Sequence, residues 1–120
     1  MLIRYTASAD NTIVNAFQLN LQTRGTGANA GAADVLETFS IYGRETTSSQ
    51  ELSRILIKFP VTDISADRTN GIIPASGSTS FYLKVYNAPH SRTTPRDYTL
   101  NVLPIAQAWQ EGDGLDLEGY

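Results

Sequence analysis

The nine residues Glu51–Phe59 constrain the fold more than any other part of the chain, because apolar residues recur there at every second position. The two alternating sets are Ile55, Ile57 and Phe59 on one side and Arg54, Leu56 and Lys58 on the other. Strict alternation with a period of two is the pattern of a half-buried β-strand. Pro60 has no backbone N–H to donate, so we expect the strand to end there.

Two later runs repeat this alternation and predict two more strands. Phe81–Tyr86 places Phe, Leu and Val on one side and Tyr, Lys and Tyr on the other, and Tyr98–Val102 follows the same rule. Three such strands predict an antiparallel sheet with one apolar face, which the rest of the chain must cover. Shorter runs predict further strands, with a turn at Asp10 and Asn11. These runs are Leu2–Ala7, Thr12–Val14 and Val35–Tyr42, in which Phe39 and Ile41 are expected to point inward.

The connections between the predicted strands are polar and rich in glycine or proline, with little helix. We expect a hairpin connection at Gly43–Gln50 and exposed loops at Gln22–Ala33, Ser65–Ser80 and Asn87–Arg96. We expect short helical turns at Val61–Ile64 and Pro104–Trp109. Short strands at regular spacing predict an all-β fold, an antiparallel β-sandwich or jelly roll with one or two short helical turns. At 120 residues, the prediction is a single domain spanning 1–120.

Composition excludes several classes of function. With 41% hydrophobic residues the chain can build a core, and with no cysteine it can form neither disulfides nor cysteine-ligated zinc sites. The net charge of −3, with Lys and Arg scattered along the chain, argues against binding to duplex nucleic acid. No apolar run approaches the ~20 residues of a membrane span, and the N-terminus does not have the pattern of a signal peptide. No motif implies a cofactor.

Three landmarks, in their order along the chain, resemble the DNRLRE-type jelly-roll modules. Ser53–Phe59 is similar to the R-x-L-L-x-F-D strand of that family, Ser80–Tyr86 to its A-x-L-x-L-Y strand, and Ala108–Gly112 to its closing W-x-E-G turn. The likeness extends from about Ala9 onward. The sequence departs from the pattern at Pro60, where many members have Asp. It also ends soon after the Trp, where members usually continue into one more strand with a second Trp.

The resemblance implies a jelly-roll sandwich without catalytic residues. Such modules occur in secreted polysaccharide-processing proteins, some of which bind acidic glycans, and in surface and virion proteins. The stretches T-R-G-T-G, V-L-E-T-F-S-I-Y-G and N-A-P-H-S look most like structural proteins of tailed bacteriophages, particularly the larger marine ones. Either the sandwich is one strand short or Tyr120 is not the natural end. An open sheet edge invites a partner's strand, so we expect the chain to self-associate.

One group of side chains is the candidate contact surface. Tyr82, Lys84 and Tyr86 alternate along one predicted strand and are expected beside Arg54 and Lys58 on a neighbouring strand. Aromatic rings with interleaved cations could stack on sugars and pair with uronate carboxylates. The same set fits a subunit interface, because Tyr and Arg are enriched there. It also fits the ordinary outer face of a sandwich, so a protein interface or no function is favoured over a glycan site.

Four other features have plain structural explanations. The acidic residues of the tail offer oxygen ligands for calcium, but their E-x-D-x-x-D-x-E spacing does not match an EF-hand, which favours a solvated turn. These residues are Glu111, Asp113, Asp116 and Glu118. The glycines of Gln22–Ala33 have neither the flanking elements nor the lysine of a phosphate loop. His90 stands in a loop with no local catalytic partners. Ile105 and Trp109 are four residues apart, which favours Trp109 as a core residue over a sugar platform.

The sequence therefore predicts a non-catalytic structural protein of a bacteriophage virion. A head decoration or vertex position comes first, and a neck, tail or fibre position second. The expected partners are other virion proteins and copies of the chain itself, contacted through the loops Gln22–Ala33, Ser65–Ser80 and Asn87–Arg96. The alternative is a carbohydrate-binding module used for glycan or host-surface recognition, with a secreted or extracellular location. Enzymatic activity is not expected, although carboxylate pairs for glycoside cleavage cannot be judged from sequence.

Overall fold

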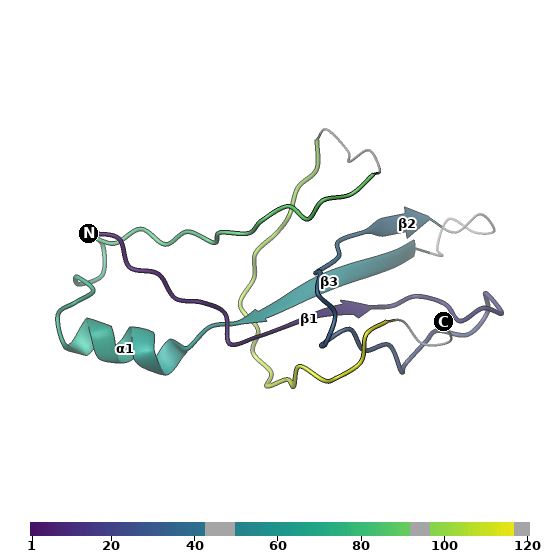
Figure 1. The fold of residues 1–120 in the computed structure, drawn as a ribbon, viewed down its shortest axis with the longest axis horizontal. Helices are drawn as coiled ribbons and strands as arrows, with labels where there is room; N and C mark the ends of the chain where they lie inside the picture. The colour runs from purple at the N-terminus through teal and green to yellow at the C-terminus, as the bar shows by residue number, and fades with distance from the viewer. Residues whose placement is uncertain (43–49, 92–96, 117–120) are drawn as a thin grey trace. The chain divides into compact units, whose positions relative to one another are not determined.

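The computed structural model describes residues 1–42, 50–91 and 97–116, whose regular structure is mostly strand with one short helix (Figure 1). The chain divides into two compact units. We call the first, Met1–Thr79 with Glu111–Tyr120, the body, and the second, Ser80–Gln110, the arm. All the helices and strands of the described residues belong to the body.

The body contains one small antiparallel sheet of three strands, in the order β1-β3-β2. The strands are β1 (Ala9–Val14), β2 (Ser40–Tyr42) and β3 (Gln50–Lys58). β3 lies in the centre and confirms the strand predicted from the alternating pattern (Figure 1). Its two neighbours are β1 and β2, so the predicted sheet of three runs, with Phe81–Tyr86 and Tyr98–Val102 beside β3, is wrong.

The register of the sheet assigns every residue of β3 to one side of the strand. Ala9 of β1 lies opposite Lys58, and Ser40 of β2 lies opposite Leu52. Just beyond the ends of β1 and β2, Asn15 donates its backbone N–H to the Leu52 carbonyl at 3.2 Å, and the Ser53 N–H donates to the Phe39 carbonyl at 3.1 Å. Because backbone groups alternate along an antiparallel strand, even-numbered residues of β3 bond toward β1 and odd-numbered residues bond toward β2.

The centre of β1 is polar and buried on both sides of the sheet. Asn11 and Thr12 are each 6% exposed, and their side chains point to opposite faces, as successive strand residues must. Asn11 Nδ2 donates to the backbone carbonyl of Glu111, while Thr12 Oγ1 accepts the backbone N–H of Glu37 at 3.0 Å. A turn at Asp10 and Asn11 was predicted because such residues favour turns, but these tertiary hydrogen bonds hold both in the strand.

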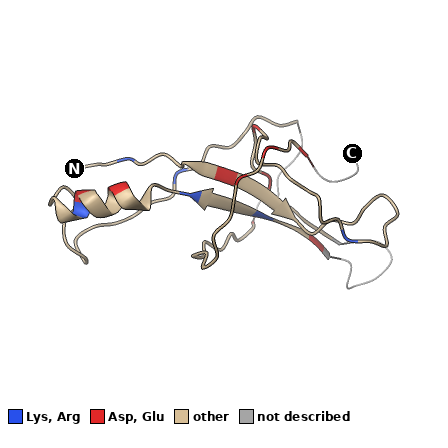
Figure 2. Ribbon diagram, turned by 90° about the horizontal axis from the view of Figure 1, so that it is seen from below, with Lys and Arg blue, Asp and Glu red and all other residues tan. Residues whose placement is uncertain are grey.

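Pro60 ends β3 and stands at the start of the helix α1 (Val61–Thr69). Proline suits this position because the first turn of a helix needs no bonded N–H. Asp63 in the first turn and Arg68 in the last complement the helix dipole, and Figure 2 shows acidic and basic residues along this helix. The helix spans nine residues, so the predicted single turn at Val61–Ile64 was too short and the predicted loop Ser65–Ser80 begins inside the helix.

The C-terminal segment of the body packs against the glycine-rich loop. Asn29 forms an isolated antiparallel bridge with Asp116, and Ala32 donates its N–H to the Gly114 carbonyl at 2.8 Å. A Cβ at Gly31 would lie 1.9 Å from the Glu111 carbonyl oxygen, so only glycine permits this approach. The predicted loop Gln22–Ala33 contains no helix or named strand, and its residues are fixed by these contacts.

Apolar burial in the described residues is small. Ile73, at 4% exposed, is the only hydrophobic residue among them that is fully buried. The predicted strand Val35–Tyr42 shrinks to Ser40–Tyr42, and Ile41 is 50% exposed rather than inward. Leu2–Ala7 forms no strand, because the first strand begins at Ala9. The predicted hairpin connection at residues 43–49 lies outside the described residues.

The arm has no helix or strand in its described residues, 80–91 and 97–110. The predicted strands Phe81–Tyr86 and Tyr98–Val102 and the predicted helical turn Pro104–Trp109 are therefore not formed in this structure. Part of the predicted loop Asn87–Arg96 lies outside the described residues. The described residues thus contain a single small sheet and no second sheet packed on it.

Candidate interaction surface

The aromatic and basic side chains predicted as a contact surface are strongly exposed on the arm. Tyr82 is 87% exposed and Tyr86 is 82% exposed. The ammonium group of Lys84 lies 4.7 Å from the centre of the Tyr86 ring, a cation–π contact that holds these two side chains together. Lys84 and Tyr86 are therefore in contact, although the backbone between them is not a strand.

The apolar side chains of the arm are exposed as well. Phe81 is 67% exposed and Val85 is 68% exposed, and five residues of the second run and its continuation share this property. These are Tyr98, Leu100, Val102, Leu103 and Ile105. Among the described residues of the arm, none takes part in a backbone hydrogen bond. The arm thus has the apolar pattern of a β-hairpin without the pairing that would form one.

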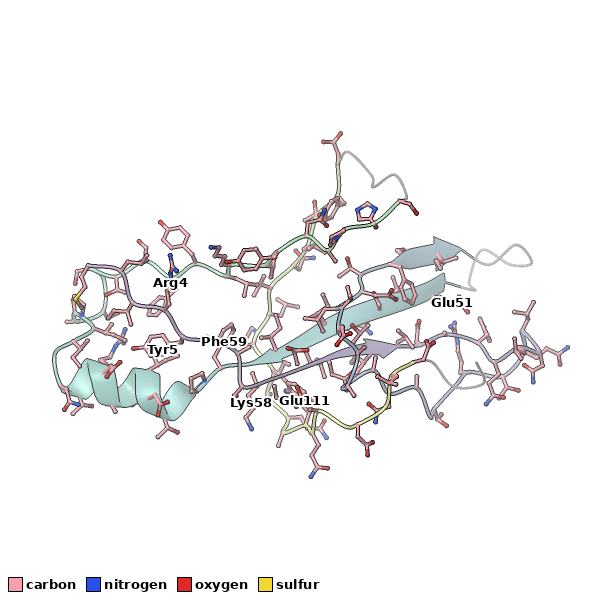
Figure 3. All side chains as sticks on the ribbon, in the orientation of Figure 1. Arg4, Tyr5, Glu51, Lys58, Phe59 and Glu111 are labelled. Atoms are coloured by element: carbon pink, nitrogen blue, oxygen red, sulfur yellow. The ribbon has the colours of Figure 1, made fainter. Side chains whose placement is uncertain are left out.

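The two basic residues of the candidate surface are exposed and lie on one face of β3. Arg54 lies opposite Ile13 of β1, and Lys58 lies opposite Ala9. Even-numbered residues share a face of the strand, so Leu56 stands between the two cations. In Figure 3, Lys58 extends away from the sheet near the end of β3.

One side of β3 is only partly paired. β2 covers residues 50–52, and the ladder reaches Ser53 through Phe39. Past this point, the backbone N–H and C=O groups of Ile55 and Ile57 point to the side of β3 on which β2 lies, because odd-numbered residues of β3 bond toward β2. No described residue makes a hydrogen bond to those groups. The residues Arg54–Lys58 therefore form an open flank, which is a ready site for an added strand.

The outer edge of β1 is capped at Asp10 by the chain itself. The backbone N–H of Asp10 points away from β3 and donates to Glu111 Oε1 at 2.7 Å. Glu111 also accepts the side-chain amide of Asn11 through its backbone carbonyl, and Figure 3 places it beside β1. Thr12 is buried beside the Glu37 segment, to which its side chain is hydrogen-bonded on one face of the sheet.

Glu111 makes the acidic tail a structural element rather than a solvated turn. Its carboxylate caps the edge of β1, and Gly112, with a φ of +81°, turns the chain toward Asn29. No group of three or more His, Asp or Glu residues that could hold a metal ion occurs in the described part of the chain. Asp113 and Asp116 are exposed, and Glu118 lies outside the described residues.

Tyr5 ties the N-terminal segment to the helix. Its hydroxyl donates to Asp67 Oδ2 at 2.5 Å, and in Figure 3 the ring points toward α1. This hydrogen bond to a carboxylate, helped by desolvation and by the negative charges of Asp67 and Asp63, raises the pKa of Tyr5 from 10.0 to about 12. The contact fixes a segment that contributes no strand.

The remaining predicted features show no chemical site. His90 is exposed, Trp109 is half-buried, and Ile105 is 48% exposed in a segment without helix, so the helical argument for their common packing is wrong. In the glycine-rich loop, the Gly25 N–H donates to the Ala16 carbonyl, which leaves it unavailable to a phosphate. No helix in the described residues is long and apolar enough to cross a membrane.

Sequence reasoning did not find the residues that hold the body together. Asn11 was assigned to a turn and Glu111 to an acidic tail, yet they bond to each other across 100 positions of the chain. The only local signal was the W-x-E-G resemblance around Glu111. Comparison with models of known families, with curated proteins and with solved structures finds no match to this chain.

Proposed function

We propose that this chain is a non-catalytic structural protein of a bacteriophage virion. The preferred position is the head surface, as a decoration or vertex protein, and the second choice is the neck, tail or fibre. The partners are other virion proteins and further copies of the chain. The particular position rests on the resemblance of the sequence to such proteins.

The observation that supports an assembly function is the exposed apolar arm. Large apolar side chains such as Phe81 and Val102, 67% and 77% exposed, lose contact with water when a partner covers them, which favours association. A protein that works in many copies supplies that partner, and many weak contacts then add up through multivalency. We further propose that the sheet is part of a jelly-roll β-sandwich, whose remaining strands come from Phe81–Tyr86 and Tyr98–Val102 once these are paired.

Immunogold electron microscopy tests the proposal. Antibody raised against the chain is applied to purified phage particles, with pre-immune serum as the control. Label over the head supports a decoration or vertex protein, and label at the tail supports the second placement. Intact particles without label, in a preparation where the antibody recognises the purified chain, would sink the virion proposal.

The alternative function is a carbohydrate-binding module, favoured by the Lys84 ammonium held over the Tyr86 ring and by the exposure of Tyr82 in the same run. Such a group could stack on sugar rings and pair with uronate carboxylates. The test is retention of the chain on an immobilised polyuronate. Tyr82→Ala should abolish retention, whereas Tyr98→Ala, at another exposed tyrosine of the arm, should leave it unchanged. Equal retention of both variants contradicts this alternative.

A further inference from the structure

We propose that Tyr98–Val102 of one copy adds as a strand to the open flank of β3, residues Arg54–Lys58, in a second copy. The inference rests on the proposed assembly function, because it names the partner and the contact through which copies associate. It joins two parts of the described chain: a flank of β3 and an arm, neither of which has backbone hydrogen-bond partners among the described residues.

The charge of the flank selects between the two apolar runs of the arm. Arg54 and Lys58 lie on one face of β3, and like charges on neighbouring strands destabilise a sheet. If Phe81–Tyr86 were added with its apolar side chains on the face of Ile55 and Ile57, Lys84 would lie on the opposite face. It would then stand between the cations Arg54 and Lys58. Tyr98–Val102 places only Thr99 and Asn101 there, which are neutral. Two β3 flanks cannot pair with each other either, since Arg54 of one copy would then face Lys58 of the other.

The two sequences also define a register. In this register, Leu100 lies opposite Ile57, Val102 opposite Ile55 and Tyr98 opposite Phe59. The apolar residues of both strands then lie on one face of the sheet. In this antiparallel arrangement Pro104 falls opposite Ser53, whose N–H is already donated to Phe39. Proline has no N–H for a ladder. The added strand therefore ends where β2 begins to occupy the flank.

A second copy is the occupant because charge and area both favour it. The arm carries three basic residues and one acidic residue, a net charge of +2, whereas the body carries six basic and eleven acidic residues, a net charge of −5. The arm and the body of two copies therefore attract each other at long range, whereas the local charges of Arg54 and Lys58 select a neutral strand. Ten large side chains of the arm are at least 48% exposed. At about 150 Å² per large side chain, the whole arm exposes on the order of 1,000 Å², and Tyr98, Leu100 and Val102 of the added strand supply part of it.

The backbone groups on both sides of the contact supply the remaining argument. Among the described residues, neither the arm nor Ile55 and Ile57 have backbone partners on the sides in question. A strand added from another copy would satisfy both, and it would bury Leu100, which is 59% exposed in the lone chain.

Disulfide trapping tests the contact, because the chain contains no cysteine of its own. One preparation carries Ile57→Cys and a second carries Leu100→Cys, and the two are mixed and mildly oxidised. Directly opposed residues in a hydrogen-bonded antiparallel pair have Cα atoms ~5.5 Å apart, within the range of a disulfide. We expect a disulfide-linked pair that contains one chain of each kind.

Two controls define the result. Leu56→Cys replaces Ile57→Cys on the opposite face of β3, and it should trap at least tenfold less linked pair with Leu100→Cys. A chain carrying both Ile57→Cys and Leu100→Cys is oxidised at high dilution to detect pairing within one copy. A monomer with an internal disulfide, or equal trapping by the Leu56 control, would overturn the inference. Immunogold labelling of particles tests the virion proposal separately. A negative trapping result therefore contradicts the strand contact without contradicting the virion proposal.

Discussion

At the scale of single residues, the body is held by polar contacts between distant parts of the chain. The Tyr5 hydroxyl and Asp67 are 62 positions apart, and the Asp10 N–H and the Glu111 carboxylate are 101 apart. Hydrogen bonds to charged groups are stronger than those between neutral groups. These bonds therefore contribute to fixing the irregular segments of a body that buries few apolar side chains.

Tyr5 should make the stability of the body depend on pH in the alkaline range. Its pKa is about 12 in the folded chain against 10.0 in the reference state, so the folded chain holds the phenol proton more tightly. The stability contributed by this group is complete below pH 10.0 and is lost as the pH rises through about 12. Ultraviolet titration of the tyrosinates, with Tyr5→Phe to assign the signal, measures this pKa.

Asp67→Asn provides the matching test, because it keeps an acceptor near Tyr5 and removes the negative charge. The pKa of Tyr5 should then move down toward 10.0. An Asp67→Asn variant in which the pKa of Tyr5 stays at about 12 contradicts the contact.

Glu111→Ala should destabilise the body, because it leaves the Asp10 N–H at the outer edge of β1 without its carboxylate partner. The expected loss in the free energy of unfolding is about 1–3 kcal/mol, measured by urea denaturation. Asp113→Ala is the control, since this neighbouring carboxylate is exposed and should change the stability by less than about 0.5 kcal/mol. Equal effects of the two substitutions would mean that net charge, not edge capping, is responsible.

At the scale of elements, the C-terminal segment and the glycine-rich loop depend on close backbone contact. Gly31→Ala would place a methyl group 1.9 Å from the Glu111 carbonyl oxygen, which is main chain and cannot rotate away. Hydrogen exchange should show that residues 111–116 lose protection. Gly71→Ala is the control, because Gly71 has a φ of +74° but nothing within 4 Å of the added Cβ. The control should show only the ~1 kcal/mol strain of a left-handed residue and leave 111–116 protected.

The sequence predicts those elements that local features specify, without knowledge of which distant segment packs beside them. β3 follows from its alternation and from Pro60, both local features. β1 was only partly recognised, because its buried Asn11 is stabilised by Glu111, far along the chain. The runs Phe81–Tyr86 and Tyr98–Val102 alternate equally well, but periodicity specifies which side of a strand is apolar and not which strand lies beside it. For the candidate surface, the sequence alone could predict that Tyr82 is exposed and that Lys84 lies near Tyr86. It could not predict the open flank of β3, which depends on where β2 ends.

At the scale of the whole molecule, association should depend on charge. The arm has a net charge of +2 and the body −5, and Lys84→Glu reduces the arm to 0. We expect this variant to associate more weakly than the natural chain at low salt, by light scattering after gel filtration. At ~1 M salt, where the Debye length is only ~3 Å, the difference should disappear. A variant that associates equally well at low salt contradicts the electrostatic part of the contact.

The open flank of β3 also limits what kind of assembly the proposed contact can build. Through this contact each copy gives one strand and receives one strand, a valence of two. Units of that valence can close as a reciprocal dimer or a ring, or extend as an unbranched line, but they cannot branch into a net. In a capsid, such a protein would form discrete clusters around a symmetry axis rather than a continuous lattice.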